Sequence, residues 1–171
     1  LTQDRLLSPI MQRREITELF ERYGPIVYRR ALSILRNPQE AEEATQEVFI
    51  RALKSKGGFE GRSKVSTWLY SITTNYCLNQ LRNQSRRREL WEEHGTAVAG
   101  PTVSQPDDGL VLQKLLSAAD EQEGQAAVYV YIDGMSHQEV AEVLGVSRRT
   151  VGNLLDRFNA WAQKKLKDPE F

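Results

Sequence analysis

Apolar residues recur every three to four positions along almost the whole chain, which is the spacing of one face of an α-helix. Residues 16–23 predict a first helix that Gly24-Pro25 should end, and residues 27–35 predict a second that ends at Asn37-Pro38. Further helices are predicted over residues 41–53, 65–88, 110–122, 125–132, 136–144 and 147–166. Only Val128–Ile132 shows a weak strand pattern, so the sequence predicts an all-α fold.

The helical pattern is interrupted between residues 95 and 109, where small and polar residues surround Gly95, Gly100, Pro101, Pro106 and Gly109. This composition is typical of a linker. A chain of 171 residues has room for two small domains. We therefore predict two small helical domains, residues 10–89 and 110–168, joined by a flexible linker at 90–109 that reaches at most ~65–70 Å when extended.

Charge is balanced over the whole chain, with 23 basic and 23 acidic residues, but it is not balanced along it. The net charge is −4 over residues 37–49, +8 over 50–88, −7 over 89–127 and +2 over 128–167. A basic stretch with interleaved aromatic residues is typical of a nucleic-acid partner. Simple solvation of helix faces is the alternative, above all for residues 37–49.

Several classes of protein are excluded by what the sequence lacks. It holds no run of about 18 apolar residues, so no membrane insertion is expected. The single cysteine, Cys77, leaves no internal disulfide and fits a reducing cytoplasm, where its simplest role is that of a small buried residue. Two histidines and one cysteine do not favour a zinc site. Without a nucleophile–base pair or a glycine-rich phosphate loop, we expect no catalytic residue, cofactor or metal, and no enzyme.

The clearest local motif spans residues 135–158. A capping box at Ser136 and Glu139, a turn at Gly145 and a second cap at Ser147 give the spacing of a helix-turn-helix, whose second helix enters the major groove of DNA. The side chains expected to reach base edges are Arg148, Arg149, Thr150 and Asn153. An ordinary helical hairpin is the alternative. Gly152 costs about 1 kcal/mol relative to alanine in a helix interior, and either permits close approach to DNA or is neutral.

The central basic segment, Phe59 to Tyr70, places aromatic rings, hydroxyls and cations next to one another. Single-stranded bases stack on such rings at about 1–3 kcal/mol each. Cations expected to follow the phosphates are Lys64, Arg82 and Arg86 to Arg88. Hydrogen bonds on the polar side of the same helix are expected from Thr67, Ser71, Asn75 and Asn79. Core packing is the alternative role for the Trp68 ring, which falls beside Val65 and Ile72.

Together these stretches resemble the bacterial sigma-70 family, extracytoplasmic-function (ECF) group, over about residues 15–166. Residues 37–52 resemble the helix that docks on RNA polymerase, and residues 59–75 resemble the promoter-melting and −10 element. Residues 131–151 resemble the −35-binding helix-turn-helix, and the linker stands where larger sigma factors have a middle domain. The resemblance implies a sigma domain 2 bundle and a sigma domain 4.

The resemblance also implies three sets of site residues. Contacts to the clamp helices of the largest polymerase subunit fall on Glu43, Gln46, Glu47, Phe49 and Leu53. Contacts to the −10 element fall on Phe59, Gly61, Arg62, Ser63, Lys64, Trp68, Asn75, Asn79 and Arg82. Contacts to the −35 element fall on Ser147, Arg148, Arg149, Thr150 and Asn153. The implied partners are core RNA polymerase, including the flap of its second-largest subunit, promoter DNA and an anti-sigma factor.

The chain departs from the family pattern at three places. Asn79 stands where many relatives have aspartate, Ala118-Ala119-Asp120 replaces a Leu-Pro pair, and Gly152-Asn153-Leu154 replaces a more basic stretch. Two other functions remain open at this point. One is a sigma-mimicking adaptor that sequesters an anti-sigma factor, and the other is a stand-alone repressor that uses only the helix-turn-helix.

Overall fold

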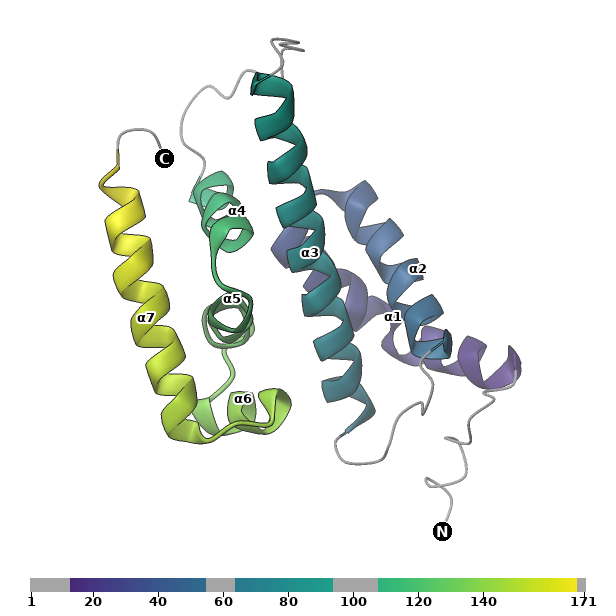
Figure 1. Cartoon of the computed structure of the whole chain (residues 1–171). Helices are drawn as coiled ribbons and strands as arrows, with labels where there is room; N and C mark the ends of the chain where they lie inside the picture. The colour runs from purple at the N-terminus through teal and green to yellow at the C-terminus, as the bar shows by residue number, and fades with distance from the viewer. Residues whose placement is uncertain (1–12, 55–63, 94–107, 169–171) are drawn as a thin grey trace.

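The computed structural model describes residues 13–54, 64–93 and 108–168, and these ranges are helical, with no strand among them (Figure 1). The elements, in chain order, are α1 (Arg13–Leu35), α2 (Pro38–Lys54), α3 (Val65–Glu93), α4 (Asp108–Ala118), α5 (Glu121–Ala127), the π-helical turn η2 (Val128–Ile132), α6 (His137–Leu144) and α7 (Arg148–Leu166). The predicted all-α class is confirmed. Within the described ranges, no helix is both long and apolar enough to cross a membrane.

The first helix continues through Gly24-Pro25, so the predicted break at this position is wrong. Proline costs about 3 kcal/mol in a helix interior. Packing on both sides outweighs that cost, because Leu19 and Tyr23 pack against the core before the proline and Val27 is buried after it. The side chain of Pro25 itself is exposed, so its ring displaces no buried neighbour.

The second and third helices complete an N-terminal unit, α1–α3. Asn37 begins α2, since its Oδ1 accepts hydrogen bonds from the backbone N–H groups of Gln39 (3.0 Å) and Glu40 (3.3 Å). The helix α3 runs to Glu93 instead of about residue 88, so the first residues of the predicted linker belong to it. No glycine or proline interrupts this segment. Its last turns extend past the other helices (Figure 1).

The predicted helix over residues 110–122 is in fact two helices. The carboxylate of Asp120 accepts hydrogen bonds from the N–H groups of Gln122 (3.0 Å) and Glu123 (3.4 Å), which ends α4 at Ala118 and begins α5. An aspartate at this position favours a new N-terminus over helix continuation. The weak strand pattern at Val128–Ile132 is also helical, as a π turn closed by the Asp133 N–H donating to the Val128 carbonyl at 3.1 Å.

The C-terminal unit, α4–α7, packs on the N-terminal unit and does not stand apart from it. In Figure 1, α3 separates α2 on one side from α4, α5 and α7 on the other, and α4 and α5 both contact α3. One apolar core spans both units: its buried members include Ile34, Leu78 and Leu81 from the N-terminal unit and Leu115, Leu116, Val128 and Phe158 from the C-terminal unit. The two predicted helical units are both present, and the structure has a shared apolar core between them.

Candidate nucleic-acid interface

The helix-turn-helix forms as its spacing predicts. Ser136 caps α6 through a complete capping box with Glu139, and Gly145 ends the helix in the left-handed region, at φ 66° and ψ 32°. The backbone N–H and the hydroxyl of Ser136 hold the pKa of the Glu139 carboxyl below its ordinary value. Ser147 then caps α7, because its Oγ accepts the Thr150 N–H at 3.1 Å. The motif is therefore built from local hydrogen bonds.

The inner face of α7 is apolar and its outer face is polar. Buried residues of this helix are Val151, Leu154, Leu155, Phe158 and Ala162. The first three pack in a core with residues of α5, η2 and α6, whereas Phe158 and Ala162 belong to the core shared with the N-terminal unit. The residues predicted to read DNA lie at its first two turns, where Ser147, Arg148, Arg149 and Asn153 are exposed and Thr150 is half-buried. Arginine and asparagine are the side chains that bind guanine and adenine in a bidentate manner. This end of α7 therefore presents to solvent side chains of the types that bind base edges in other proteins.

A second candidate surface is a polar row along α3. Thr67, Ser71, Asn75 and Asn79 follow one another every four residues, which places them on one face of the helix. The Ser71 hydroxyl donates to the Thr67 carbonyl at 3.3 Å, and Asn79 Oδ1 accepts from Arg82 Nη1 at 3.1 Å. Asn75 and Asn79 are both exposed. The structure thus aligns three of the residues expected at the −10 element, Asn75, Asn79 and Arg82.

One member of this row has a partner from the C-terminal unit. Asn75 Oδ1 accepts a hydrogen bond of 2.6 Å from Nε2 of Gln125, which lies on α5. The helix α6 also lies against α3. The C-terminal unit therefore occupies a contact that the sequence assigned to DNA, and nothing in the local sequence around Asn75 signals this.

Trp68 and Lys64 stand at the beginning of α3. Trp68 is half-buried against the core of the N-terminal unit, beside Val65 and Ile72, so core packing accounts for much of its ring. Lys64 is exposed directly before the helix. The four other residues expected at the −10 element, Phe59, Gly61, Arg62 and Ser63, lie outside the described residues.

The expected polymerase-docking residues lie on α2. Glu43, Gln46 and Leu53 are exposed, and Glu47 is half-buried with its carboxylate 2.8 Å from Arg51 Nε. Their spacing puts these four on one face of the helix. Ile50 falls on the same face and is 40% exposed, a residue that the sequence reading missed. The face is therefore acidic at one end and apolar at the other.

Phe49 does not belong to that exposed face. Its side chain is 4% exposed and packs edge-on against Phe20, with ring centroids 4.9 Å apart. Helical spacing turns Phe49 inward, because it falls beside Val48 and Ala52 among the buried residues of α2. The prediction that Phe49 itself contacts a partner is corrected: it supports the surface from beneath, while Phe20, 43% exposed, lies beside it.

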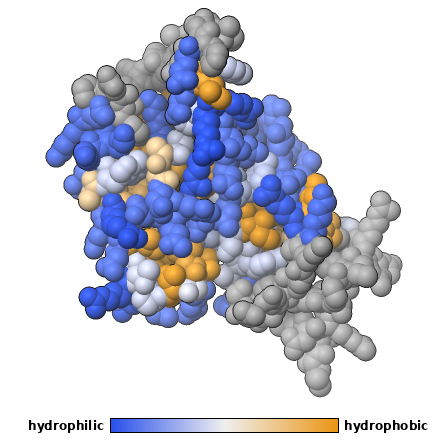
Figure 2. All heavy atoms as spheres, in the orientation of Figure 1, coloured by the Kyte–Doolittle hydropathy of each residue, from blue (hydrophilic) through white to orange (hydrophobic). Residues whose placement is uncertain are grey.

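The face of the molecule drawn in Figure 2 is mostly hydrophilic, with separate hydrophobic patches. Cys77 is fully buried in the shared core, and that burial raises the pKa of its thiol to about 12. A thiol in this state is neither a nucleophile nor a metal ligand at neutral pH. The described residues include no cluster of histidine, cysteine, aspartate and glutamate that could hold a metal ion.

Both halves of the chain match known protein families. Residues 19–87 match sigma-70 region 2, and residues 118–163 match a homeodomain-like domain. The ECF RNA polymerase sigma factor SigW of Bacillus subtilis is 30% identical over 166 residues, covering 88% of each chain. The ECF RNA polymerase sigma factor SigE of Mycolicibacterium smegmatis is 34% identical over 152 residues, covering 82% of this chain and 57% of that protein.

Two solved structures share the fold. The sigma factor RpoE in complex with the anti-sigma factor NepR from Bartonella quintana has a TM-score of 0.52 at 21% identity, covering 91% of this chain and 99% of that one. CnrH in complex with the cytosolic domain of CnrY has a TM-score of 0.51 at 20% identity, covering 91% and 90%. With region 2 over α1–α3, a helix-turn-helix in α6–α7 and a 30% identical relative along most of its length, the chain belongs to the ECF group of the sigma-70 family of sigma factors.

Proposed function

We propose that this protein is a promoter-specificity subunit that binds core RNA polymerase, recognises the −35 and −10 elements of a promoter and captures the melted −10 strand. The observation that carries the proposal is the coexistence, in one chain of an ECF sigma factor, of an exposed base-reading helix end on α7 and a polar row on α3. An adaptor that never engages DNA has no need of either surface.

Docking on the polymerase is assigned to the exposed face of α2. Carboxylates and an amide at Glu43, Gln46 and Glu47 suit a basic, hydrogen-bonding partner, and the apolar end at Ile50 and Leu53 adds buried area. The clamp helices of the largest subunit are the proposed partner of this face. The C-terminal unit is proposed to contact the flap of the second-largest subunit.

Recognition of the −35 element is assigned to the first two turns of α7. Arg148, Arg149 and Asn153 are exposed there, and one good bidentate contact to a base contributes about 1–3 kcal/mol of discrimination. Ser147 and Thr150 fix the start of the helix, since Ser147 Oγ lies 2.9 Å from Thr150 Oγ1. Their part is to position the recognition helix on the DNA backbone.

Capture of the −10 strand is assigned to the beginning and the polar row of α3, together with the segment before it. An unpaired base leaves the stack at a cost of a few kcal/mol, which stacking and hydrogen bonds to the protein offset. No hydrolysis is required, so the chain acts without a catalytic residue. Holding both units on the polymerase makes the second promoter contact intramolecular, which raises its effective concentration.

The place of action follows from the partners, because bacterial chromosomal DNA and RNA polymerase share the cytoplasm. Restraint by an anti-sigma factor is part of the proposal. It is supported by the fold shared with the sigma factor RpoE, which was solved in complex with the anti-sigma factor NepR.

A binding experiment with core RNA polymerase tests the docking step. The double variant Gln46→Ala, Glu47→Ala removes two polar groups from the exposed face of α2, so it should weaken binding to core polymerase at least about tenfold while its helix content is unchanged. Glu89→Ala, which removes an exposed carboxylate near the end of α3, is the matched control and should bind like the wild type. Equal binding by the double variant, or no binding by the wild type, contradicts the proposal.

A further inference from the structure

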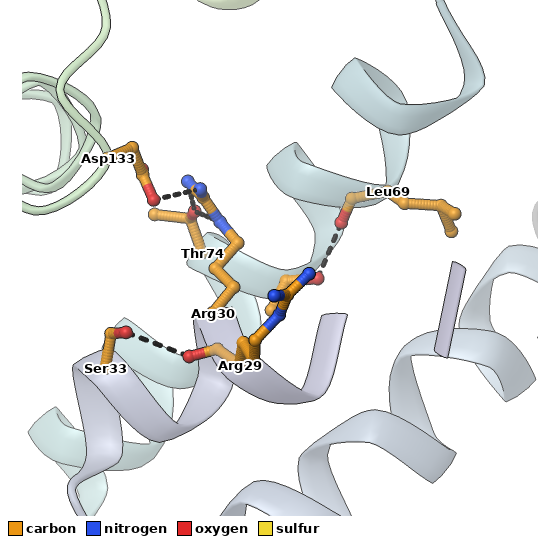
Figure 3. Close-up of polar contacts among 7 residues, drawn as sticks. Arg29, Arg30, Ser33, Leu69, Thr74 and Asp133 are labelled. Atoms are coloured by element: carbon orange, nitrogen blue, oxygen red, sulfur yellow. Dashed lines mark hydrogen bonds and ion pairs between the residues drawn. The ribbon is translucent and has the colours of Figure 1, made fainter. Parts of the chain in front are cut away.

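A buried arginine joins the two units of the molecule. Arg30 lies on α1 with a side chain that is 3% exposed, and its Nε and Nη2 both donate to Thr74 Oγ1 on α3, at 3.0 and 2.7 Å. Its Nη1 lies 2.5 Å from Oδ1 of Asp133, which directly follows η2 in the C-terminal unit. Figure 3 shows Arg30 reaching from α1 between Thr74 and Asp133.

Aromatic rings from both units enclose the same guanidinium group. The guanidinium carbon of Arg30 lies 4.5 Å from the ring centroid of Tyr70, on α3, and 4.9 Å from that of Tyr129, in η2. Tyr129 is fully buried. Each unit thus supplies one polar partner and one ring to a desolvated cation, an environment in which such contacts are stronger than in water.

Other polar contacts cross the boundary on either side of Arg30. Gln125 on α5 donates to Asn75 Oδ1 at 2.6 Å, and Gln113 on α4 donates to the Leu35 carbonyl at the end of α1. Asn75 directly follows Thr74 on α3 and belongs to the polar row assigned above to the −10 strand. Asn75 stays exposed in the closed arrangement, but its Oδ1 is already engaged by Gln125 and not by the DNA that the proposed function assigns to it.

We propose that Arg30, Thr74 and Asp133 form a latch that holds the free chain in a closed resting state, in which Gln125 of the C-terminal unit engages Asn75 Oδ1, and that this latch opens before α3 takes up DNA. The second half of this inference rests on the proposed function, whereas the first half concerns the free chain alone. The latch is distinct from the apolar core around it, because it depends on a charge pair that only the closed state desolvates.

Arg30 and Asp133 are removed from water in the closed state only. In the open state Arg30 and Asp133 regain water, so removing the Asp133 charge penalises only the closed state, where the buried arginine loses its counter-ion. The bond from Arg30 to Thr74 lies within the N-terminal unit and persists on opening. In the part of the chain that the structure describes, the second carboxylate oxygen of Asp133 is buried without a hydrogen-bond partner. A pair that is only half satisfied yields to a competing partner more readily than a full network.

The test measures the distance between the units in the free chain. Spin labels on Glu42→Cys in α2 and Gln163→Cys in α7, both exposed positions, are introduced in a Cys77→Ala background and read by pulsed electron spin resonance. The otherwise unchanged chain should give one narrow, short distance distribution. Asp133→Asn, of almost the same volume, should raise the open, long-distance population roughly tenfold or more.

A matched control separates the latch from the general loss of an ion pair. Glu123 pairs with Arg157 Nε at 3.0 Å inside the C-terminal unit, and its side chain is 15% exposed, as is that of Asp133. Glu123→Gln should therefore leave the distance distribution unchanged. Gln125→Ala, which removes the hydrogen bond to Asn75, should shift the distance distribution in the same direction as Asp133→Asn. If Asp133→Asn fails to fold, the shift in Gln125→Ala decides whether polar contacts between the units hold the closed state.

Three results overturn the inference: a broad distribution in the unmodified labelled chain, no shift in either latch variant, or an equal shift in Glu123→Gln. Adding core RNA polymerase completes the experiment, and the unmodified labelled chain should then move to the long distance. Binding with the short distance retained overturns the latch but leaves the proposed function standing. Absence of binding overturns the proposed function, while the free-chain distances still decide whether the closed state depends on Asp133.

Discussion

At the scale of single residues, Gly152 offers a direct test of what α7 requires. An added Cβ at this position meets no atom within 4 Å, and the residue lies inside the helix. We predict that Gly152→Ala raises the free energy of unfolding by about 0.5–1 kcal/mol, measured by urea denaturation, because alanine loses less backbone entropy. Ala160→Gly, at an exposed position of the same helix, should lower it by a similar amount. A destabilised Gly152→Ala would show that α7 needs the glycine.

Cys77 gives a second prediction at this scale. Burial raises the pKa of its thiol to about 12, well above the ordinary value, so the reactive thiolate is absent from the folded chain at pH 8. A thiol reagent such as dithiobis-nitrobenzoate should leave the folded protein unmodified and should label one thiol per chain in guanidinium chloride. Rapid labelling of the folded protein at pH 8 would show that the shared core around Cys77 opens freely.

The role of a residue can be predicted from the sequence when its partners are close in sequence, as in helix caps, but not when its partners are distant, as in buried polar groups. Ser136, Glu139 and Ser147 act within four residues of themselves, so their spacing alone predicted both caps of the helix-turn-helix. Arg30 is different, because Thr74 lies 44 positions away in sequence and Asp133 lies in the other unit. Nothing in the period of apolar residues distinguishes a buried arginine from a solvated one.

At the scale of elements, the start of α7 carries the prediction about DNA. We predict that Arg149→Ala lowers transcription from promoters that use this protein by roughly 5- to 150-fold, the range expected for one lost bidentate base contact. The assay is run-off transcription with reconstituted polymerase. Lys164→Ala, which removes an exposed cation from the last turn of the same helix, is the control and should retain most of the yield. Equal losses in both variants would point to a charge effect and not to base readout.

Helix boundaries were predictable where the residues that favour a helix end coincide with the ends of the buried segments. They were not predictable where tertiary packing opposes such a residue. Most helices follow their apolar period, but α1 passes through Pro25 because buried residues on both sides outweigh the lost hydrogen bond. Asp120 divides one expected helix into two, since its carboxylate caps α5 more favourably than it continues α4. Phe49 was assigned to a binding face, whereas one position along a helix turns a side chain by about 100° and buries this one.

At the scale of the whole molecule, the two units pack against each other through a common apolar core and a buried charge pair. A linker of the predicted length permits both a separated and a packed arrangement, so composition alone does not choose between them. The packed arrangement is favoured by apolar side chains of α3. Leu78 and Leu81 are buried in one core with residues of both the N-terminal and the C-terminal unit. The closed arrangement leaves the start of α7 exposed, while Gln125 engages Asn75 in the α3 row. Under the proposed function, the free chain is therefore ready for −35 recognition before it is ready for −10 capture.

Reconstituted transcription on fragmented genomic DNA of the source organism shows whether this chain directs RNA polymerase to promoters. Core polymerase is incubated with and without the protein, and the 5′ ends of the transcripts are mapped. We expect a small set of start sites that appear only with the protein and share two sequence elements upstream. A transcript profile identical to that of core polymerase alone would show that the chain does not select promoters.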